Sequence, residues 1–348
     1  MNRPRPVARE LPGEPPRMEY RRLRAGEPLP ATALCAITFG AAGRGGLPDA
    51  MGQAVSIHLN LRPLAGTDAT ELWHGDAPVQ AGREGPIRFA SGGSYLAGTV
   101  AIDERAAGGL AGAAREAYAA ISRFTARSTH PHLLRMYNYF SAINAGDGDE
   151  ERYKQFCHGR AAGFQGRTDP LWPAATAIGR QDDSPLLQVY WLAGTAPGRA
   201  IENPRQVSAF QYPRRYGPSP PSFSRAMQVG GALLVSGTAS VLGHRSHHAG
   251  DLQAQLDEIL RNLETLRSCG MSTPATGRGS LLKVYLRDAA AAGFVAAYLR
   301  ERLPAAAQFL VLGADICRRE LLAEIDAADF SARPNPGSAA PAGSGSYG

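Results

Sequence analysis

One carboxyl group in this sequence has surroundings that suit acid catalysis. Glu324 lies in the run Leu321–Ala327, LLAEIDA, whose apolar residues predict a largely buried strand. Burial disfavours the ionised form and raises the pKa of a carboxyl group, so Glu324 can keep its proton near neutral pH and act as a general acid. The alternative is that Glu324 only ends a strand at the protein surface, where isolated acidic residues are common.

A second group of candidate residues lies in segment 201–225, IENPRQVSAFQYPRRYGPSPPSFSR. Prolines stiffen this segment between its arginines and tyrosines, which are Arg205, Tyr212, Arg214, Arg215, Tyr216 and Arg225. A stiff loop with guanidinium and hydroxyl groups suits the binding of a planar carboxylate, because little entropy is lost on binding. The alternative is a solvated linker, but linkers seldom have this density of tyrosine and arginine. We therefore favour a binding role.

The charge of the chain favours a small anionic ligand over a nucleic acid. The net charge is +6, yet the arginines are spread along the sequence and form no basic run with interleaved aromatic residues. Guanidinium groups bind carboxylates in a bidentate fork, so dispersed arginines fit an anionic small molecule better. Only Lys154 and Lys283 are lysines, which indicates a general preference for arginine and makes each single arginine less informative.

The sequence lacks the motifs that several other kinds of active site require. The sequence has no GxSxG, HExxH or Walker A motif, and no GxGxxG between a strand and a helix. His244, His247, His248 and Asp251 are close together, but neighbouring residues on an extended loop point in opposite directions, so we expect no metal site. The four cysteines are widely spaced and are expected to be reduced thiols.

The two ends of the sequence are expected to lie outside the folded domains. Residues 1–30 are rich in Pro, Arg and Glu and residues 331–348 in small residues, which predicts disordered tails. Neither a signal peptide nor a long apolar run is present, so we expect a cytoplasmic protein that does not bind membranes. The length predicts two domains, at 31–198 and 226–330, joined by the segment 199–225.

The order of predicted elements in the first domain repeats in the second. Strand, helix, strand, helix and two further strands recur, with LAGTVAID matching VSGTASVL and HLLRMYNYF matching SLLKVYLRD. We interpret this as an internal duplication of an α/β half, a sheet with helices on one face. The strand that matches LLAEIDA reads LLQVYWLAG and has no acid, which favours a chemical role for Glu324.

Near the start of the chain, apolar and polar residues alternate in Ala54–Leu64, which predicts one half-buried strand.

Longer motifs resemble a known family. From YGPSPPSFSRA through VSGTAS to LLAEIDA, the second half resembles the YjgF/RidA superfamily, whose single domains have a chorismate mutase-like fold. Across residues 50–328, the segments HPHLLRMYNYFSAIN, ERYKQFCHGRAAGF, SAFQYPRRYGPSPPSFSRA and ICRRELLAEIDA resemble the chorismatases, a branch with two such halves. The resemblance implies a cofactor-free enzyme that cleaves the enolpyruvyl ether of chorismate and releases pyruvate. It also implies a homotrimer.

The resemblance gives roles to individual residues. Glu324 matches the family's catalytic acid, which would protonate the methylene carbon of the enol ether. Chorismate carries two carboxylates, for which arginines are natural partners. The residues that the resemblance implies for substrate binding are Arg152, Arg160, Tyr212, Arg215, Tyr216, Arg225, Gly237 and Cys317.

The family that this chain resembles divides by product. One branch of the family hydrolyses chorismate to a dihydroxycyclohexadiene carboxylate, and another forms 3-hydroxybenzoate, with some 4-hydroxybenzoate, without net addition of water. The second branch resembles this chain in having a cysteine seven residues before the acid, here Cys317. We expect 3-hydroxybenzoate and keep the hydrolase as an alternative. Two further alternatives are a RidA-like imine deaminase, whose arginine is missing around Phe309–Val311, and a non-catalytic sensor of small molecules.

Overall fold

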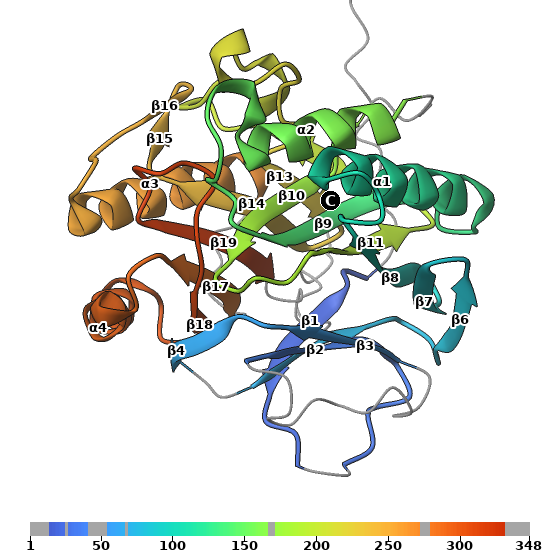
Figure 1. Ribbon diagram of the computed structural model, residues 1–348. Helices are drawn as coiled ribbons and strands as arrows, with labels where there is room; N and C mark the ends of the chain where they lie inside the picture. Colours follow the sequence, from blue (N-terminus) through green and yellow to red (C-terminus); the bar gives the residue numbers. More distant parts are fainter. Residues whose placement is uncertain are drawn as a thin grey trace, which may run out of the picture.

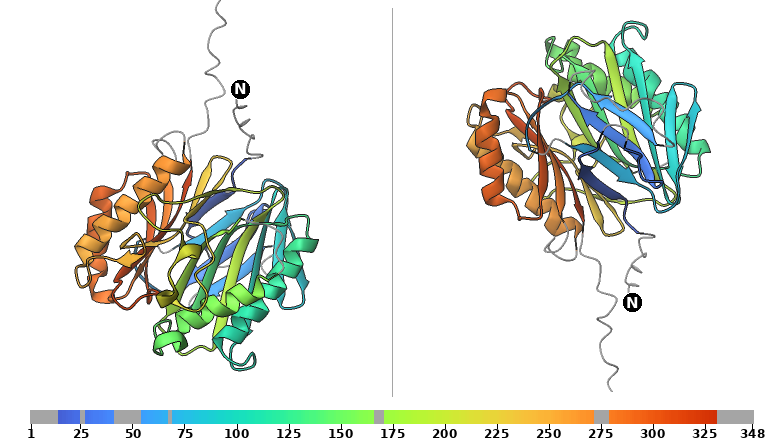
Figure 2. Two further views of the ribbon diagram at one scale, coloured as in Figure 1. Left: turned by 90° about the horizontal axis from the view of Figure 1, so that it is seen from above. Right: turned by 90° about the horizontal axis from the view of Figure 1, so that it is seen from below.

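A computed structural model describes residues 14–24, 27–40, 54–66, 69–165, 171–271 and 279–330. Two large sheets turn their inner faces toward a shared core, and helices cover the outer face of each (Figure 1). A small sheet forms a third wall of this core, seen best from below (Figure 2). The helices in this part of the chain are α1 (Leu110–Arg127), α2 (Arg152–Gly163), α3 (Leu252–Gly270) and α4 (Ala292–Arg302). None of these described helices combines the length and apolar character needed to cross a membrane.

The amino-terminal sheet has six strands in the order β10-β9-β11-β8-β7-β6. Helices α1 and α2 cover it because apolar side chains recur along α1 at helical spacing, as at Ala117, Ile121 and Phe124, all of which are buried. The strands are β6 (Gln80–Glu84), β7 (Ile87–Gly92), β8 (Tyr95–Asp103), β9 (His132–Ser141), β10 (Ala174–Arg180) and β11 (Leu186–Gly194).

The carboxyl-terminal sheet has seven strands in the order β12-β13-β14-β19-β17-β18-β4. Helix α3 begins where the Asp251 carboxylate accepts a hydrogen bond from the backbone N–H of Ala254, and it packs Leu256, Ile259 and Leu263 on the sheet. The strands are β4 (Arg62–Gly66), β12 (Arg199–Ile201), β13 (Ala226–Val229), β14 (Ala232–Ala239), β17 (Ser280–Leu286), β18 (Gln308–Gly313) and β19 (Ala323–Phe330). A short hairpin, β15 (Val241–Leu242) and β16 (Arg245–Ser246), follows β14.

The topology confirms the duplication that the sequence predicts. In each half a hairpin is followed by a helix, a strand, a second helix and a parallel strand, which gives the parallel pairs β9/β10 and β17/β18. The last strand of each half then returns to lie between two earlier ones, β11 between β8 and β9, and β19 between β14 and β17. The predicted fold class, two α/β halves with helices on one face of each sheet, is therefore confirmed.

The small sheet corrects the prediction of a disordered tail over residues 1–30. Strand Arg17–Arg21 (β1) belongs to this sheet, because it pairs with β5 and the Tyr20 hydroxyl donates to the carbonyl of Leu282, at 3.0 Å. Residues 1–13 and 331–348, which complete the predicted tails, lie outside the described residues. The strand order is β1-β5-β2-β3, with β2 (Ala33–Phe39), β3 (Val55–Leu59) and β5 (Thr70–His74).

The prediction of one strand over Ala54–Leu64 is also wrong. The chain bends after Leu59, so β3 belongs to the small sheet while β4 pairs with β18 in the carboxyl-terminal sheet. Two strands of different sheets therefore share this short segment. As a result, the carboxyl-terminal sheet includes a strand from the first half, and the predicted boundary at residue 198 does not separate the strands of the two halves completely.

Candidate functional site

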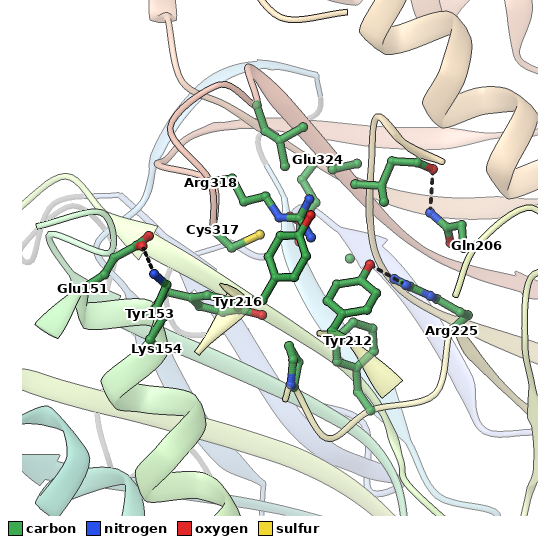
Figure 3. A pocket seen from close by; sticks show the side chains of 16 residues that line it. Glu151, Tyr153, Lys154, Gln206, Tyr212, Tyr216, Arg225, Cys317, Arg318 and Glu324 are labelled. Carbon is green, nitrogen blue, oxygen red and sulfur yellow. Dashed lines mark hydrogen bonds and ion pairs between the residues drawn. The ribbon is translucent and has the colours of Figure 1, made fainter. Parts of the chain in front are cut away.

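A pocket that opens to solvent lies where four parts of the chain meet. Its walls come from α2, from β14 with the following hairpin, from the connecting segment 199–225, and from β19 with the loop before it (Figure 3). The lining residues are Glu151, Tyr153, Lys154, Gln206, Tyr212, Tyr216, Pro221, Phe223, Arg225, Gly237, Ala239, Val241, Cys317, Arg318, Leu321 and Glu324.

Glu324 forms part of the pocket wall near the beginning of β19. It lies opposite Tyr285 of β17 and Ala239 of β14, and its side chain is 5% exposed. Among the described residues, burial and nearby charges, and no hydrogen bond, are the main influences on its carboxyl group. Burial raises the pKa of Glu324 to about 8, and the negative charge of Asp326 acts in the same direction. The carboxyl group is therefore largely protonated at neutral pH.

Gly237 on β14 faces this carboxyl group. A Cβ atom at position 237 would lie 1.9 Å from Glu324 Oε1, so any side chain there would displace the acid. The backbone N–H of Gly237 donates a hydrogen bond to Thr176 Oγ1, at 3.0 Å, which fixes this part of the strand. A glycine is thus required here for space beside Glu324, and the backbone itself forms that side of the pocket.

Two arginines from different elements line the pocket. Arg225 Nη2 donates to the Tyr212 hydroxyl oxygen at 2.7 Å and to the Val207 carbonyl at 2.8 Å, and Arg225 Nε is buried without a hydrogen-bond partner in the described part of the chain (Figure 3). Arg318 Nη1 donates to the His244 carbonyl and to a serine hydroxyl of β16, both at 3.0 Å. Each guanidinium group is thus held on one side by the protein. The positions are preset for binding an anion such as a carboxylate.

Aromatic side chains of the connecting segment form the opposite wall. The rings of Tyr212 and Tyr216 lie 5.2 Å apart, and His244 packs against both, with centroid distances of 6.4 and 5.7 Å. The guanidinium of Arg318 lies over the Tyr216 ring, 4.4 Å from its centroid. This stacking fixes the segment over the pocket.

Neutral groups surround Glu324 on its remaining side. Burial raises the pKa of the Cys317 thiol well above its ordinary value, and the charge of Glu324 raises it further, so the thiol stays protonated. Burial likewise raises the pKa of the Tyr153 hydroxyl far above its ordinary range. An apolar, partly desolvated environment of this kind favours a neutral carboxylic acid.

Of the residues predicted for the site, six line this pocket, and they are Tyr212, Tyr216, Arg225, Gly237, Cys317 and Glu324. Arg152 and Arg160 are not among the lining residues, and a role for them in substrate binding stays a prediction. Arg152 forms a two-pronged ion pair with Glu104, with N–O distances of 2.9 Å, and also donates to a backbone carbonyl of β9. Arg160 is buried between α1 and α2, where its guanidinium lies 5.0 Å from the centroid of the Tyr118 ring.

Arg215 also lies outside the pocket lining. Its side chain is exposed, and its Nη2 atom is 2.7 Å from Nδ1 of His244. It lies over the Tyr216 ring at 5.1 Å. Arg215 therefore contacts a lining residue without lining the pocket itself.

Sequence reasoning missed Arg318, Tyr153, Lys154 and Gln206. Arg318 directly follows Cys317 in ICRREL, but in a chain so rich in arginine this adjacency is no signal. Lys154 is held at the pocket by an ion pair with Glu151, at 3.4 Å. The described residues contain no group of His, Cys, Asp or Glu arranged to hold a metal ion.

Comparisons with known proteins agree with this geometry. The family model described as Chorismatase FkbO/Hyg5-like, N-terminal, matches residues 71–193. A chorismatase of Streptomyces hygroscopicus is 36% identical over 276 residues, which are 74% of this chain and 78% of that protein. A 3-hydroxybenzoate synthase of the same species is 35% identical over 291 residues, or 78% of this chain and 84% of that protein.

The fold gives the same result. A crystal structure of a chorismatase superposes with a TM-score of 0.78 at 32% sequence identity, and the match covers 90% of this chain and 98% of that chain. Sequence and fold thus agree over most of the length of both proteins. The resemblance found in the sequence is confirmed, and this chain belongs to the chorismatase family.

Proposed function

We propose that this protein converts chorismate to 3-hydroxybenzoate and pyruvate. The observation that carries the proposal is the carboxyl group of Glu324, which is buried in a pocket wall and has a pKa raised to about 8. Related proteins at 35% and 36% identity are named 3-hydroxybenzoate synthase and chorismatase. A neutral carboxylic acid in an apolar pocket is the group that cleavage of an enol ether needs.

The reaction begins with proton transfer from Glu324 to the methylene carbon of the enolpyruvyl group. The bond between the ring carbon and the ether oxygen then breaks, and its electrons form the ketone of pyruvate. The neighbouring ring hydroxyl attacks the vacated ring carbon and returns one proton to Glu324, which leaves an arene oxide. Opening of this oxide gives 3-hydroxybenzoate, so the atoms balance without added water.

Arg225 and Arg318 are the proposed partners of the two substrate carboxylates. Both line the same pocket as Glu324, and each uses only part of its hydrogen-bonding capacity on the protein. Two guanidinium groups balance the two negative charges of chorismate, so the bound complex is neutral when Glu324 is protonated. Lys154 contributes less, because it already pairs with Glu151.

Cys317 is the proposed determinant of the product. Its side chain lines the pocket and packs against the shared core and the amino-terminal core. A thiol in this place occupies space beside Glu324 that a water molecule would need for hydrolysis. The internal attack by the ring hydroxyl is then favoured over attack by water.

The test is to incubate the purified protein with chorismate in H₂¹⁸O and identify the products by mass spectrometry. We expect 3-hydroxybenzoate and pyruvate in equal amounts, with no ¹⁸O in the hydroxybenzoate. A dihydroxycyclohexadiene carboxylate would instead indicate the hydrolase. Binding without turnover would indicate a sensor, and turnover of imines but not of chorismate would indicate a deaminase.

Two predictions concern the protein as a whole. The homotrimer and the cytoplasmic location stay predictions, and sedimentation and cell fractionation test them. One chain supplies the proposed acid, both arginines and the tyrosines of the pocket.

A further inference from the structure

Four charged side chains form a cluster in the shared core behind Glu324. They are Glu71 on β5, Arg135 on β9, Lys283 on β17 and Asp326 on β19, with exposures of 3%, 0%, 2% and 2%. Each of the three sheets that enclose the core contributes at least one of them. Charged residues are rarely buried so completely unless they are paired, so the contacts within the cluster matter.

Asp326 is held from three sides. Lys283 Nζ lies 3.5 Å from Asp326 Oδ1, and Arg135 Nη2 lies 3.7 Å from Asp326 Oδ2. The hydroxyl group of Tyr285 donates a hydrogen bond to Oδ2 at 2.8 Å. Lys283 also donates to both carboxylate oxygens of Glu71, at 3.0 and 2.9 Å. Two positive and two negative charges make the cluster neutral, which is the condition for burying it.

The cluster is connected to the pocket. Asp326 and Glu324 are two residues apart on β19, so their side chains point to the same face of the sheet. Thr176 Oγ1 lies 2.5 Å from Arg135 Nη2 and 3.4 Å from Asp326 Oδ2, and the same atom accepts the hydrogen bond from Gly237. Gly237 in turn is the residue that faces the carboxyl group of Glu324.

More positive than negative side chains act on the carboxyl group of Glu324. Arg135, Arg225 and Arg318 lower its pKa, since a nearby cation favours a carboxylate. Burial and Asp326 act against them. The neighbouring Cys317 and Tyr153 are neutral at ordinary pH, because the pKa of each is raised. Asp326 is therefore the anion that offsets the arginines around the acid.

We infer that Asp326 is a positioning residue for the reaction at Glu324, because its fixed carboxylate places a negative charge on the same strand face and makes a second anion there unfavourable. Glu324 thus carries its proton into the reaction although arginines surround it. The inference rests on the proposed function only in one respect, namely that the proton of Glu324 is transferred to chorismate. The protonation itself is a property of the free protein.

Two variants of matched charge test this. Asp326→Asn and Glu71→Gln each remove one negative charge from the cluster, and each leaves Lys283 with one carboxylate partner. They differ in that only Asp326 lies beside Glu324. The carboxyl signal of Glu324 is followed by ¹³C NMR as a function of pH and is assigned by its loss in Glu324→Gln. The pH dependence of kcat/KM for chorismate is measured on the same proteins.

We expect Asp326→Asn to lower the pH at which Glu324 ionises by about one unit or more, and to move the high-pH limb of the rate profile equally. Glu71→Gln should shift both by less than a third of that amount. Equal shifts in the two variants, or no shift in Asp326→Asn, would overturn the inference. If Asp326→Asn does not fold, Asp326→Ser takes its place.

The wild-type titration is independent of any variant. A Glu324 signal that titrates near the ordinary carboxyl value would overturn the inference by itself. If the shifts occur as expected but chorismate is not consumed, the inference stands and the proposed function fails. If chorismate is consumed and the two variants shift alike, only the inference fails.

Discussion

At the scale of single residues, the raised pKa of Glu324 follows from its burial and from the absence of described hydrogen-bond donors to its carboxyl group. No described donor forms a hydrogen bond to its carboxyl group, and Gly237 leaves no side chain between the group and the pocket. Burial therefore disfavours the anion, while the carboxyl group stays accessible to a ligand from the pocket that it lines. The burial that raises the pKa of Glu324 to about 8 therefore keeps its proton available to a ligand in the pocket.

The two pocket arginines should bind substrate, whereas Arg215 should not. In an inactive Glu324→Gln background, Arg225→Ala and Arg318→Ala should each weaken chorismate binding by about 2 kcal/mol, or roughly 30-fold, the scale for loss of a charge-assisted pair. Arg215→Ala is the matched control, because Arg215 is exposed and lies outside the lining. Isothermal titration calorimetry measures all three. Equal losses in the three variants would mean that overall charge, and not the pocket, sets the affinity.

Cys317 should control the fate of the ring and not the cleavage of the ether. Cys317→Ala removes a sulfur atom from the pocket wall and gives space to a water molecule. Pyruvate release should stay within a few-fold of wild type, while the product shifts from 3-hydroxybenzoate toward the dihydroxycyclohexadiene carboxylate. Chromatography of the ring products with a parallel pyruvate assay checks this. An unchanged product ratio would remove Cys317 from the choice between the two outcomes.

At the scale of elements, the sequence predicted the repeated order of strands and helices but not which elements pack against one another. The duplication, the helices and the burial of Glu324 follow from periodicity, which depends on local sequence. Periodicity shows which residues share a helix face but not which face meets the pocket. Arg152 and Arg160 on α2 were assigned to binding by the family resemblance, and neither is among the residues that line the pocket. The small sheet escaped prediction because its short strands pair with distant partners.

Arg152 should matter for stability and not for binding. It links α2 to the loop after β8 through Glu104, which is itself largely buried. Arg152→Ala leaves that carboxylate without its partner and should lower the free energy of unfolding by about 1–3 kcal/mol. The KM for chorismate of the folded variant should stay near the wild-type value. Urea unfolding and steady-state kinetics test the two parts, and a large rise in KM at unchanged stability would return Arg152 to the site.

At the scale of the whole molecule, a protonated buried acid should reduce stability at neutral pH. The folded state keeps a proton on Glu324 up to a pKa of about 8, whereas the unfolded state loses it near the ordinary value of 4.5. The folded state thus binds more protons between these values, so stability falls as pH rises through this window, by about 1.4 kcal/mol per unit. At pH 7 the total is on the order of 3 kcal/mol.

Glu324→Gln should therefore stabilise the protein at pH 7, because the amide has no proton to retain. The gain should be on the order of 3 kcal/mol at pH 7 and less than about 1 kcal/mol at pH 5, because pH 5 is only slightly above the pKa of 4.5 in the unfolded state. Urea unfolding of both proteins at the two pH values measures this. A variant that is equally or less stable at pH 7 would contradict the raised pKa.

The role of Glu324 as proton donor is tested most directly by the rate of pyruvate release from chorismate in Glu324→Gln. Glutamine keeps the shape of the side chain but cannot give up a proton, so the rate at pH 7 should fall by about 100-fold or more while chorismate binding remains. In the wild type the same rate should be constant below pH 8 and decline above it, as Glu324 ionises. Full pyruvate release by folded Glu324→Gln would contradict the account.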